Sequence, residues 1–151
     1  MHKITPFLWF DQEAEVAMNH YVSIFKNSKV LSVNRMEGKV MSVTFELDGQ
    51  RFMGLNAGPQ FKFNEAVSFF VDCETQAEVD ELWGKLSSGG EKGRCGWLKD
   101  KFGLSWQIIP SALGKLMSDP DPRKSQAVLQ AMLKMSKIEI SELEQAYNQT
   151  L

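Results

Sequence analysis

Two segments of the chain, 63 residues apart, repeat the same order of an apolar run and an acid-rich helix start. The run at 4–10 (ITPFLWF) precedes DQEAEV, and the run at 67–73 (VSFFVDC) precedes ETQAEV. The shared Ala-Glu-Val triplets pair Thr5 with Ser68 and Phe7 with Phe70. A repeated unit of this size restricts a chain of 151 residues to folds assembled from two similar halves.

Each apolar run is followed by a segment with the apolar spacing of an amphipathic helix. The first predicted helix buries Ala14, Ala17, Met18, Tyr21, Ile24 and Phe25. The second is opened by a capping box, with Thr75 as N-cap and Glu78 three residues later. It buries Val79, Leu82, Trp83 and Leu86.

Three more strands are predicted after each helix. Those of the first half lie at 30–36, 40–47 and 52–56, joined at Glu37-Gly38 and Asp48-Gly49, where glycine supplies the positive φ of a tight hairpin. Those of the second half lie near Lys92, at 96–99 and at 104–109, with a turn at 100–103. Pro59 and Pro110 are expected to close the final strands. Each half therefore reads β-α-β-β-β, which predicts an α+β fold with two units.

The chain is expected to form one domain, residues 1–151, with repeat 1 at about 1–62, repeat 2 at about 63–112 and a helical extension at about 113–151. Asp121 as N-cap and Pro122 at the first helical position predict a helix in this extension. Its apolar stripe is Val128, Leu129, Met132 and Met135. A capping box of Ser141 and Glu144 predicts a short last helix that buries Leu143 and Tyr147.

Charge and composition exclude several classes of function. Seventeen basic and nineteen acidic residues give a net charge of −2. This balance argues against nucleic-acid binding, which depends on clustered Lys and Arg. No apolar run is long enough for a signal peptide or a membrane span. Two cysteines, Cys73 and Cys95, fit a reducing compartment, so a cytoplasmic protein of bacterial type is expected.

The duplication and several segments resemble one known family. The segments are 4–10, 63–69 (FNEAVSF), 73–76 (CETQ), 95–106 (CGWLKDKFGLSW), and the tail 118–122 (SDPDP) with 131–135 (AMLKM). They resemble the PhnB-like group, labelled 3-demethylubiquinone-9 3-methyltransferase-like, of the vicinal oxygen chelate superfamily, which includes glyoxalase I, extradiol dioxygenases and bleomycin-resistance proteins. The resemblance implies two curved, cup-like mixed sheets around a cavity, and commonly a homodimer. Methyl transfer is not expected, because the G-x-G-x-x-G loop of a nucleotide-type cofactor is absent.

The resemblance also places metal ligands on the first and last strand of each unit. Alignment by the Ala-Glu-Val triplets, and by Pro59 with Pro110, puts Thr5, Ser68, Asn56 and Gln107 at these positions. All four are neutral and polar, so neither a tightly bound metal nor another cofactor is expected. Of the two histidines, His2 lies near this site at the N-terminus, and His20 is expected on an exposed helix face.

The same strands predict a pocket. Alternation along a strand places Phe7 and Trp9 on the side of Thr5, and Phe70 and Asp72 on the side of Ser68. The candidate ligand-binding residues are Thr5, Phe7, Trp9, Asn56, Ser68, Phe70, Cys95, Trp97 and Gln107. In the alternative interpretation Phe7, Trp9 and Phe70 fill a core. Cys95 has no histidine near it in sequence to act as a base, which favours a structural role.

The predicted function is metal-independent binding of a small apolar or aromatic molecule by a homodimer, without nucleic acid or membrane partners. One alternative is a metal-recruiting lyase, isomerase or dioxygenase, or an enzyme using Cys95 or Asp100 for acid–base chemistry. Another is a structural homodimer with a filled cavity. In the turn at 100–103, Gly103 is expected at positive φ and the charged side chains in solvent. Alternatively, Trp97, Lys99 and Asp100 form a lip of the pocket, and Lys99 contacts an anionic ligand.

Overall fold

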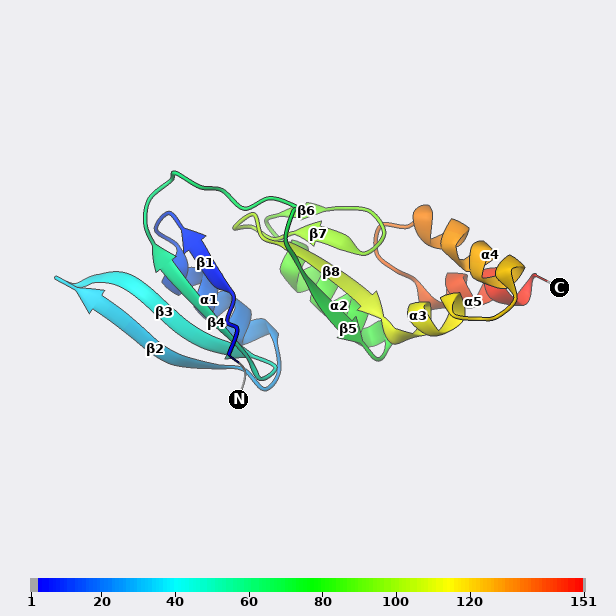
Figure 1. Ribbon diagram of the computed structural model, residues 1–151, viewed down its shortest axis with the longest axis horizontal. Helices are drawn as coiled ribbons and strands as arrows, with labels where there is room; N and C mark the ends of the chain where they lie inside the picture. Colours follow the sequence, from blue (N-terminus) through cyan, green and yellow to red (C-terminus); the bar gives the residue numbers. More distant parts are fainter. Residues whose placement is uncertain (1–2, 151) are drawn as a thin grey trace. The chain divides into compact units, whose positions relative to one another are not determined.

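The structure is a computed structural model that describes residues 3–150 and divides into two compact units, Met1–Phe63 and Asn64–Leu151. Each unit holds one four-stranded sheet (Figure 1). The strand orders are β1-β4-β3-β2 and β5-β8-β7-β6, so the same topology occurs twice. The predicted α+β fold with repeated β-α-β-β-β order is therefore confirmed.

The first unit consists of five elements. They are β1 (Phe7–Phe10), α1 (Ala14–Ile24), β2 (Lys29–Met36), β3 (Lys39–Leu47) and β4 (Gln50–Asn56). β1 pairs with β4 in parallel, and the other pairs are antiparallel. Glu37 and Gly38 both have positive φ, as do Asp48 and Gly49, which is the conformation of a type I′ hairpin turn.

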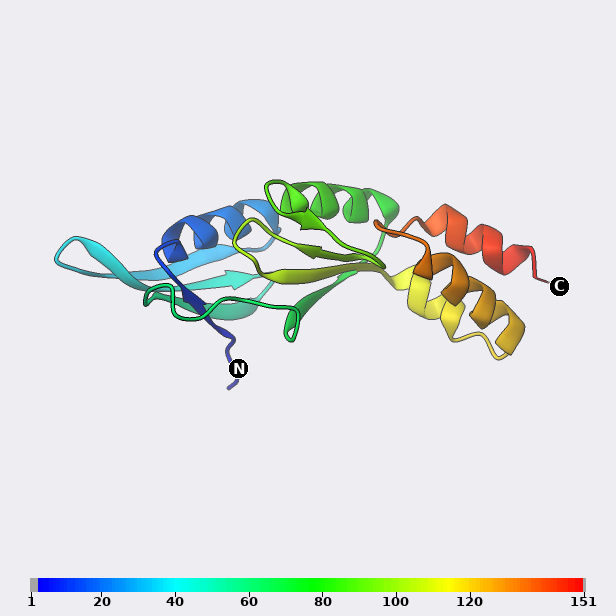
Figure 2. The same cartoon turned by 90° about the horizontal axis from the view of Figure 1, so that it is seen from above.

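Helix α1 covers one face of the first sheet (Figure 2). Leu8 and Phe10 of β1 are buried on that face with five of the six predicted helix residues, whereas Phe25 is the C-cap and is half-buried. Phe7 lies on the other face and is 55% exposed. The interpretation of Phe7 as a core residue is therefore wrong.

The second unit repeats these elements with shorter strands. They are β5 (Ser68–Cys73), α2 (Gln76–Ser87), β6 (Glu91–Lys92), β7 (Trp97–Lys99) and β8 (Ser105–Pro110). The cap of α2 forms as predicted, because the hydroxyl of Thr75 accepts a 3.1 Å hydrogen bond from the Glu78 N–H. The Glu78 carboxylate accepts a 2.8 Å bond from the Glu74 N–H, one residue before the N-cap.

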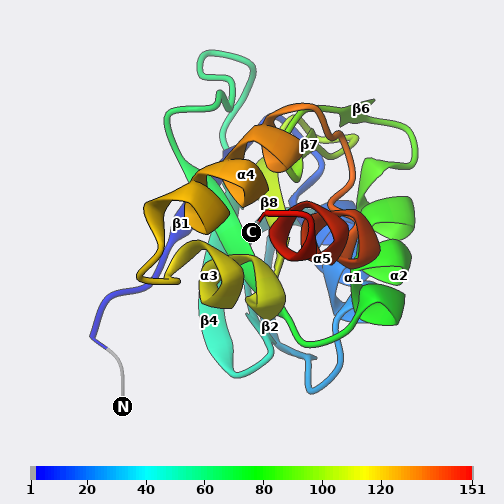
Figure 3. The same cartoon turned by 90° about the vertical axis from the view of Figure 1, so that its right-hand side faces the viewer.

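Three helices follow β8 and gather into one bundle (Figure 3). They are α3 (Ser111–Met117), α4 (Pro122–Leu133) and α5 (Ile140–Asn148). Asp121 caps α4 as predicted, its side chain accepting a 2.9 Å bond from the Arg123 N–H. The bundle has a core of its own, formed by Ile109, Leu113, Val128, Met135, Ile138 and Leu143. None of the helices among residues 3–150 is long and apolar enough to cross a membrane.

The helices differ from the sequence analysis in two places. The sequence did not predict α3, a short helix with Gly114 in its middle and no side-chain cap. It forms because Leu113 is buried in the core of the bundle. The predicted Ser141 capping box is wrong: the helix begins at Ile140, two residues before the start that an N-cap at Ser141 would give, and Glu139 is an N-cap without a side-chain bond. The side chain of Gln76 supplies the bond instead, since its Oε1 accepts the Ile140 N–H at 2.7 Å.

The turn between β7 and β8 has the predicted backbone but not the predicted charge placement. Gly103 has a φ of +92°, as expected. Asp100, however, is 3% exposed, and its carboxylate accepts hydrogen bonds from the N–H groups of Phe102 and Leu104 and from Trp106. The expectation that Asp100 lies in solvent, or at the lip of a pocket, is therefore wrong.

Candidate functional site

A largely apolar pocket of about 350 Å³ lies within the second unit. Strands β5, β7 and β8 contribute Phe70, Asp72, Trp97, Gln107 and Ile109 to its lining. Helices α3 and α4 contribute Leu113, Gly114, Met117 and Met132. The volume falls in the lower part of the range of small-molecule sites, about 300–1,000 Å³.

Strand alternation explains which residues reach this pocket. Leu98, Trp106 and Ile108 are buried, whereas their neighbours Trp97 and Gln107 point to the other face and pair across the β7–β8 ladder. Phe70 pairs with Gln107 on that same face and is 60% exposed. The interpretation of Phe70 as a core residue is therefore wrong, and its ring is available at the pocket.

Cys95 reaches the pocket from the loop before β7. Cys95 and Gly96 both have positive φ, of 58° and 85°. Their N–H groups donate to the carbonyls of Met135 and Ser136 at 2.9 and 2.8 Å. These two bonds join the loop to the segment after α4, and they hold the half-buried Cys95 side chain beside the pocket.

Two hydrogen bonds hold the polar side chains of this face. Gln107 Nε2 donates to the Ser68 hydroxyl at 3.0 Å. The Ser111 hydroxyl donates to Asp72 Oδ1 at 2.8 Å. The amide and the carboxylate at the pocket are thus oriented by partners on neighbouring elements, which favours directional contacts with a ligand.

The four candidate residues of the first unit do not line this pocket. Thr5 precedes β1, which begins at Phe7 rather than at residue 4, and is half-buried. Trp9 Nε1 donates to the Gly58 carbonyl at 2.9 Å, and its ring packs edge-on against Phe61. Asn56 has a structural role, since its Oδ1 accepts the Ala14 N–H at 2.9 Å at the start of α1.

The strand register also corrects the alignment of the two repeats. Phe70 pairs with Gln107, but its counterpart Phe7 pairs with Met53, and Asn56 pairs with Phe10. Met53, and not Asn56, is therefore the counterpart of Gln107. Pro59 lies beyond β4, whereas Pro110 lies inside β8, so the two prolines are not equivalent.

The residues at the positions where the resemblance places metal ligands do not fit a tightly held divalent metal. Ser68 and Gln107 bond to each other, and Met53 is a thioether that suits soft metals only. Within residues 3–150, no three or more His, Cys, Asp or Glu side chains form a group that would hold a metal ion. His2 lies outside the described residues. His20 is half-buried beside Tyr21, not exposed as expected.

Charged groups near the pocket are distributed unevenly. Lys99 does not line the pocket, and its ammonium lies 3.1 Å from the Glu65 carboxylate. The hydrogen bond from Lys99 lowers the pKa of Glu65. Cys73 lies on the opposite face of β5, where burial raises the pKa of its thiol to about 12.

Sequence reasoning missed the helical side of the pocket. Leu113 and Met117 belong to α3, for which the sequence showed no helix start, and Met132 appeared only as part of a helix stripe. The sequence did contain a weak helix signal directly after the buried strand. Leu116 and Met117 follow Leu113 by three and four residues, which is the apolar spacing of a helix.

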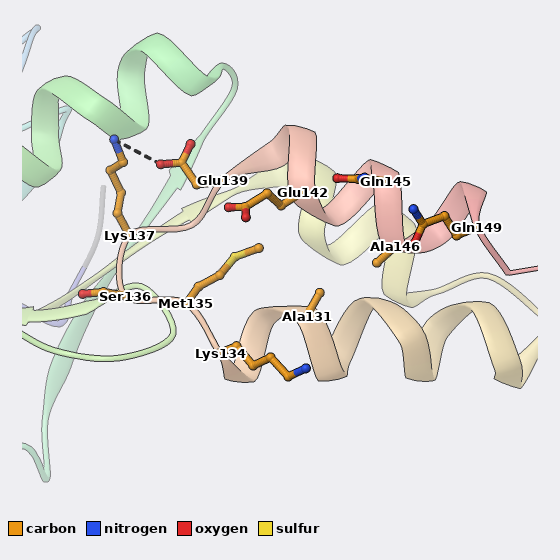
Figure 4. Close-up of a pocket in the computed structure, with 10 residues that line it drawn as sticks. All are labelled: Ala131, Lys134, Met135, Ser136, Lys137, Glu139, Glu142, Gln145, Ala146 and Gln149. Carbon is orange, nitrogen blue, oxygen red and sulfur yellow. Dashed lines mark ion pairs between the residues drawn. The ribbon is translucent and has the colours of Figure 1, made fainter.

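A second hollow, of about 580 Å³, runs between α4 and α5 (Figure 4). Its lining is mostly polar and includes Lys134, Glu142, Gln145 and Gln149. Lys137 at one end pairs with Glu139 at 3.3 Å and with Asp80 at 2.8 Å. Among the described residues, no hydrogen bond or ion pair holds the side chains of Lys134, Glu142, Gln145 and Gln149, so this groove offers a ligand less preorganised contact than the apolar pocket does.

Comparison with solved structures shows the same fold. A PhnB protein from Bacillus cereus is 37% identical, with a TM-score of 0.69 over 73% of this chain and 100% of its own. A protein from Pseudomonas aeruginosa is 17% identical, with a TM-score of 0.63 over 73% and 98%. A gene product from Arabidopsis thaliana is 19% identical, with a TM-score of 0.51 over 70% and 96%.

No functionally curated protein matches the chain. The family profile described as 3-demethylubiquinone-9 3-methyltransferase matches residues 2–109, which span both repeats. The glycines of the chain show no cofactor loop at the strand-to-helix turns: Gly89 and Gly90 follow α2 and lead into β6. The resemblance inferred from the sequence is confirmed, and the chain belongs to the PhnB-like, 3-demethylubiquinone-9 3-methyltransferase family.

Proposed function

We propose that this protein binds a small apolar or aromatic molecule in the pocket of its second unit without the help of a metal. One observation carries the proposal: Phe70, Cys95, Trp97 and Gln107, chosen from the sequence as ligand-binding residues, line a single pocket. Aromatic rings with a few oriented polar groups are the usual lining of a small-molecule site. The alternative functions that recruit a metal are less well supported, because Ser68, Gln107 and Met53 are poor ligands for a divalent metal.

Gly114 allows the pocket to be filled without disturbing the fold. It lies in α3 and lines the pocket, and a Cβ added to it would meet no atom within 4 Å. Gly84 in α2 is the matched control, because it is also helical, has the same open surroundings and lies outside the pocket lining. The variants Gly114→Phe and Gly84→Phe thus differ in whether the new ring enters the pocket.

The binding test uses 1-methylnaphthalene, a planar apolar probe, followed by tryptophan fluorescence and calorimetry. We expect the unmodified protein and Gly84→Phe to bind one probe per chain, and Gly114→Phe to lose binding at least tenfold. Equal binding by both variants would place the ligand elsewhere and overturn the proposal. Calorimetric titration with Zn, Ni, Fe and Mn completes the test, since one tight site per chain would contradict metal-independent binding.

We also propose that two copies of the chain associate. The first unit exposes Phe7, and Phe61 is 63% exposed where it packs on Trp9. An aromatic surface of this kind is favourably covered by a second copy. A stable interface would bury roughly 800 Å² per partner. Light scattering at micromolar concentration should give twice the mass of one chain, and Phe61→Ser should weaken the association; a particle of single-chain mass would refute it.

The cellular location is a proposal as well. Cys73 is buried and Cys95 half-buried, and both are free thiols. Free thiols persist in a reducing compartment such as the cytoplasm. Fractionation of cells expressing the full-length protein would test this location.

A further inference from the structure

The pocket of the second unit contains one charged side chain among the described residues that line it, the carboxylate of Asp72. No lysine or arginine lines the pocket. Within residues 3–150, the bond that Asp72 accepts comes from the neutral hydroxyl of Ser111 and not from a base. Asp72, which is exposed, therefore presents a negative charge at the pocket, and in the part of the chain that the structure describes no ion pair neutralises it.

The basic residues closest in sequence to the pocket lining are engaged elsewhere. Arg94, next to Cys95, donates to the Leu133 carbonyl at 3.5 Å. Lys99 lies two residues after Trp97 on β7, but its ammonium pairs with Glu65 at 3.1 Å. An anionic ligand would thus meet the Asp72 carboxylate without a compensating cation. Two like charges close together repel each other, so the pocket disfavours an anion.

Two aromatic rings complement this charge. Phe70 is 60% exposed and Trp97 half-buried, and both line the pocket with Asp72. The faces of Trp and Phe rings attract cations. The thioethers of Met117 and Met132 on the helical side are polarizable and adapt to the shape of a flat ring.

We propose that the ligand of this pocket is a planar aromatic cation, in which the rings pack against Phe70 and Trp97 and the positive charge faces Asp72. This inference rests on the proposed binding function and adds the charge class of the ligand. Ser111 holds the carboxylate in place before the ligand arrives, so the Asp72 side chain loses little conformational freedom on binding.

The test compares two probes of nearly the same shape, the cation 1-methylquinolinium and neutral 1-methylnaphthalene, with 1-naphthoate as the anion. Cation–π attraction and one partly exposed ion pair together predict that the cation binds about five- to tenfold more tightly than the neutral probe. The anion should bind most weakly of the three. Higher ionic strength should weaken binding of the cation and leave the neutral probe unchanged.

The variant Asp72→Asn keeps the shape and the oxygen that accepts the Ser111 bond but removes the charge. We expect it to lose the preference for the cation while its affinity for 1-methylnaphthalene stays within twofold. The control Asp48→Asn, in the β3–β4 turn of the first unit, should keep the preference.

The possible failures can be told apart. If the neutral probe or the anion binds as tightly as the cation, or if Asp72→Asn weakens cation and neutral probe alike, the charge assignment is wrong while the binding function stands. If none of the three probes binds the unmodified protein, the binding function fails and the charge assignment fails with it.

Discussion

The indole Nε1 of Trp106 donates a 2.9 Å hydrogen bond to Oδ2 of Asp100, and both residues are 3% exposed. Oδ1 of the same carboxylate accepts the N–H groups of Phe102 and Leu104 at 2.9 and 3.0 Å. One buried carboxylate thus satisfies three donors and joins the β7–β8 turn to the tryptophan of β8. Its partners explain why a charged residue is stable in this position.

Replacement of Asp100 should therefore be costly. Asp100→Ala leaves three donors without their acceptor, and we expect a loss of about 2–4 kcal/mol in the free energy of unfolding. Asp100→Asn, which keeps one acceptor oxygen, should cost less. The neighbouring Lys99→Met variant removes a partly exposed ion pair and should stay within about 0.5 kcal/mol. Urea unfolding of the three variants measures these differences, and an unchanged Asp100→Ala midpoint would contradict the structural role.

Gly103 in the same turn should resist substitution for a different reason. Its φ of +92° is unfavourable for residues with a Cβ, and most of all for β-branched ones. Gly103→Val is expected to lower the free energy of unfolding by about 1–3 kcal/mol. Gly84→Val, in the exposed middle of α2, is the comparison without a positive φ. Thermal and urea unfolding should rank Gly103→Val as the less stable variant; the reverse order would show that the turn is not strained.

Burial of Cys73 predicts how stability changes in alkali. Desolvation, supported by the charges of Glu78 and Asp72, raises the pKa of the folded thiol to about 12 from an ordinary value of 9.0. Between these pH values the folded chain keeps a proton that the unfolded chain releases, so stability falls as the pH rises, by at most about 1.4 kcal/mol per pH unit.

Comparison with Cys73→Ala isolates this effect. From about pH 8 to about pH 10.5, under reducing conditions, the unmodified protein should lose about 2 kcal/mol more than Cys73→Ala does. Cys95→Ala, which retains Cys73, should decline like the unmodified protein. Parallel pH profiles for the Cys73→Ala and unmodified proteins would show that the thiol does not cause the decline.

The two cysteines should also differ in chemical accessibility. Cys73 is fully buried, whereas Cys95 is half-buried at the pocket. Iodoacetamide should therefore label the native protein once, at Cys95, and label both cysteines after unfolding. Saturating 1-methylquinolinium should slow the native reaction if the probe occupies the pocket. Mass spectrometry of peptides locates the label, and modification of Cys73 in the native protein would count against the packing of β5.

Much of the fold follows from local patterns in the sequence. The hairpins at Glu37-Gly38 and Asp48-Gly49, the Thr75 cap and the Asp121-Pro122 helix start depend on residues within four positions of each other. Such local contacts can be predicted from the residue types that helix caps and hairpin turns prefer. The repeat added the order of the elements, and strand alternation placed Phe70 and Asp72 on the side of Ser68.

The site depended on contacts between distant parts of the chain. Phe7 pairs with Met53 through a parallel ladder between strands that are 40 residues apart. The alignment of Pro59 with Pro110 instead selects Asn56 as the counterpart of Gln107. The pocket was completed by α3, which lacks a strong helix signal and forms because Leu113 finds a core.

By itself, the sequence determined the two β-α-β-β-β units, their turns and the aromatic face of the second sheet, because periodicity and turn residues act locally. Only the tertiary structure decided that Asp100 is buried, that Asn56 accepts the Ala14 N–H at the start of α1, and that α3 and α4 complete the pocket that Asp72 lines. A side chain's burial and partners are properties of the folded neighbourhood, where desolvation must be balanced by hydrogen bonds from residues that the chain brings together only on folding.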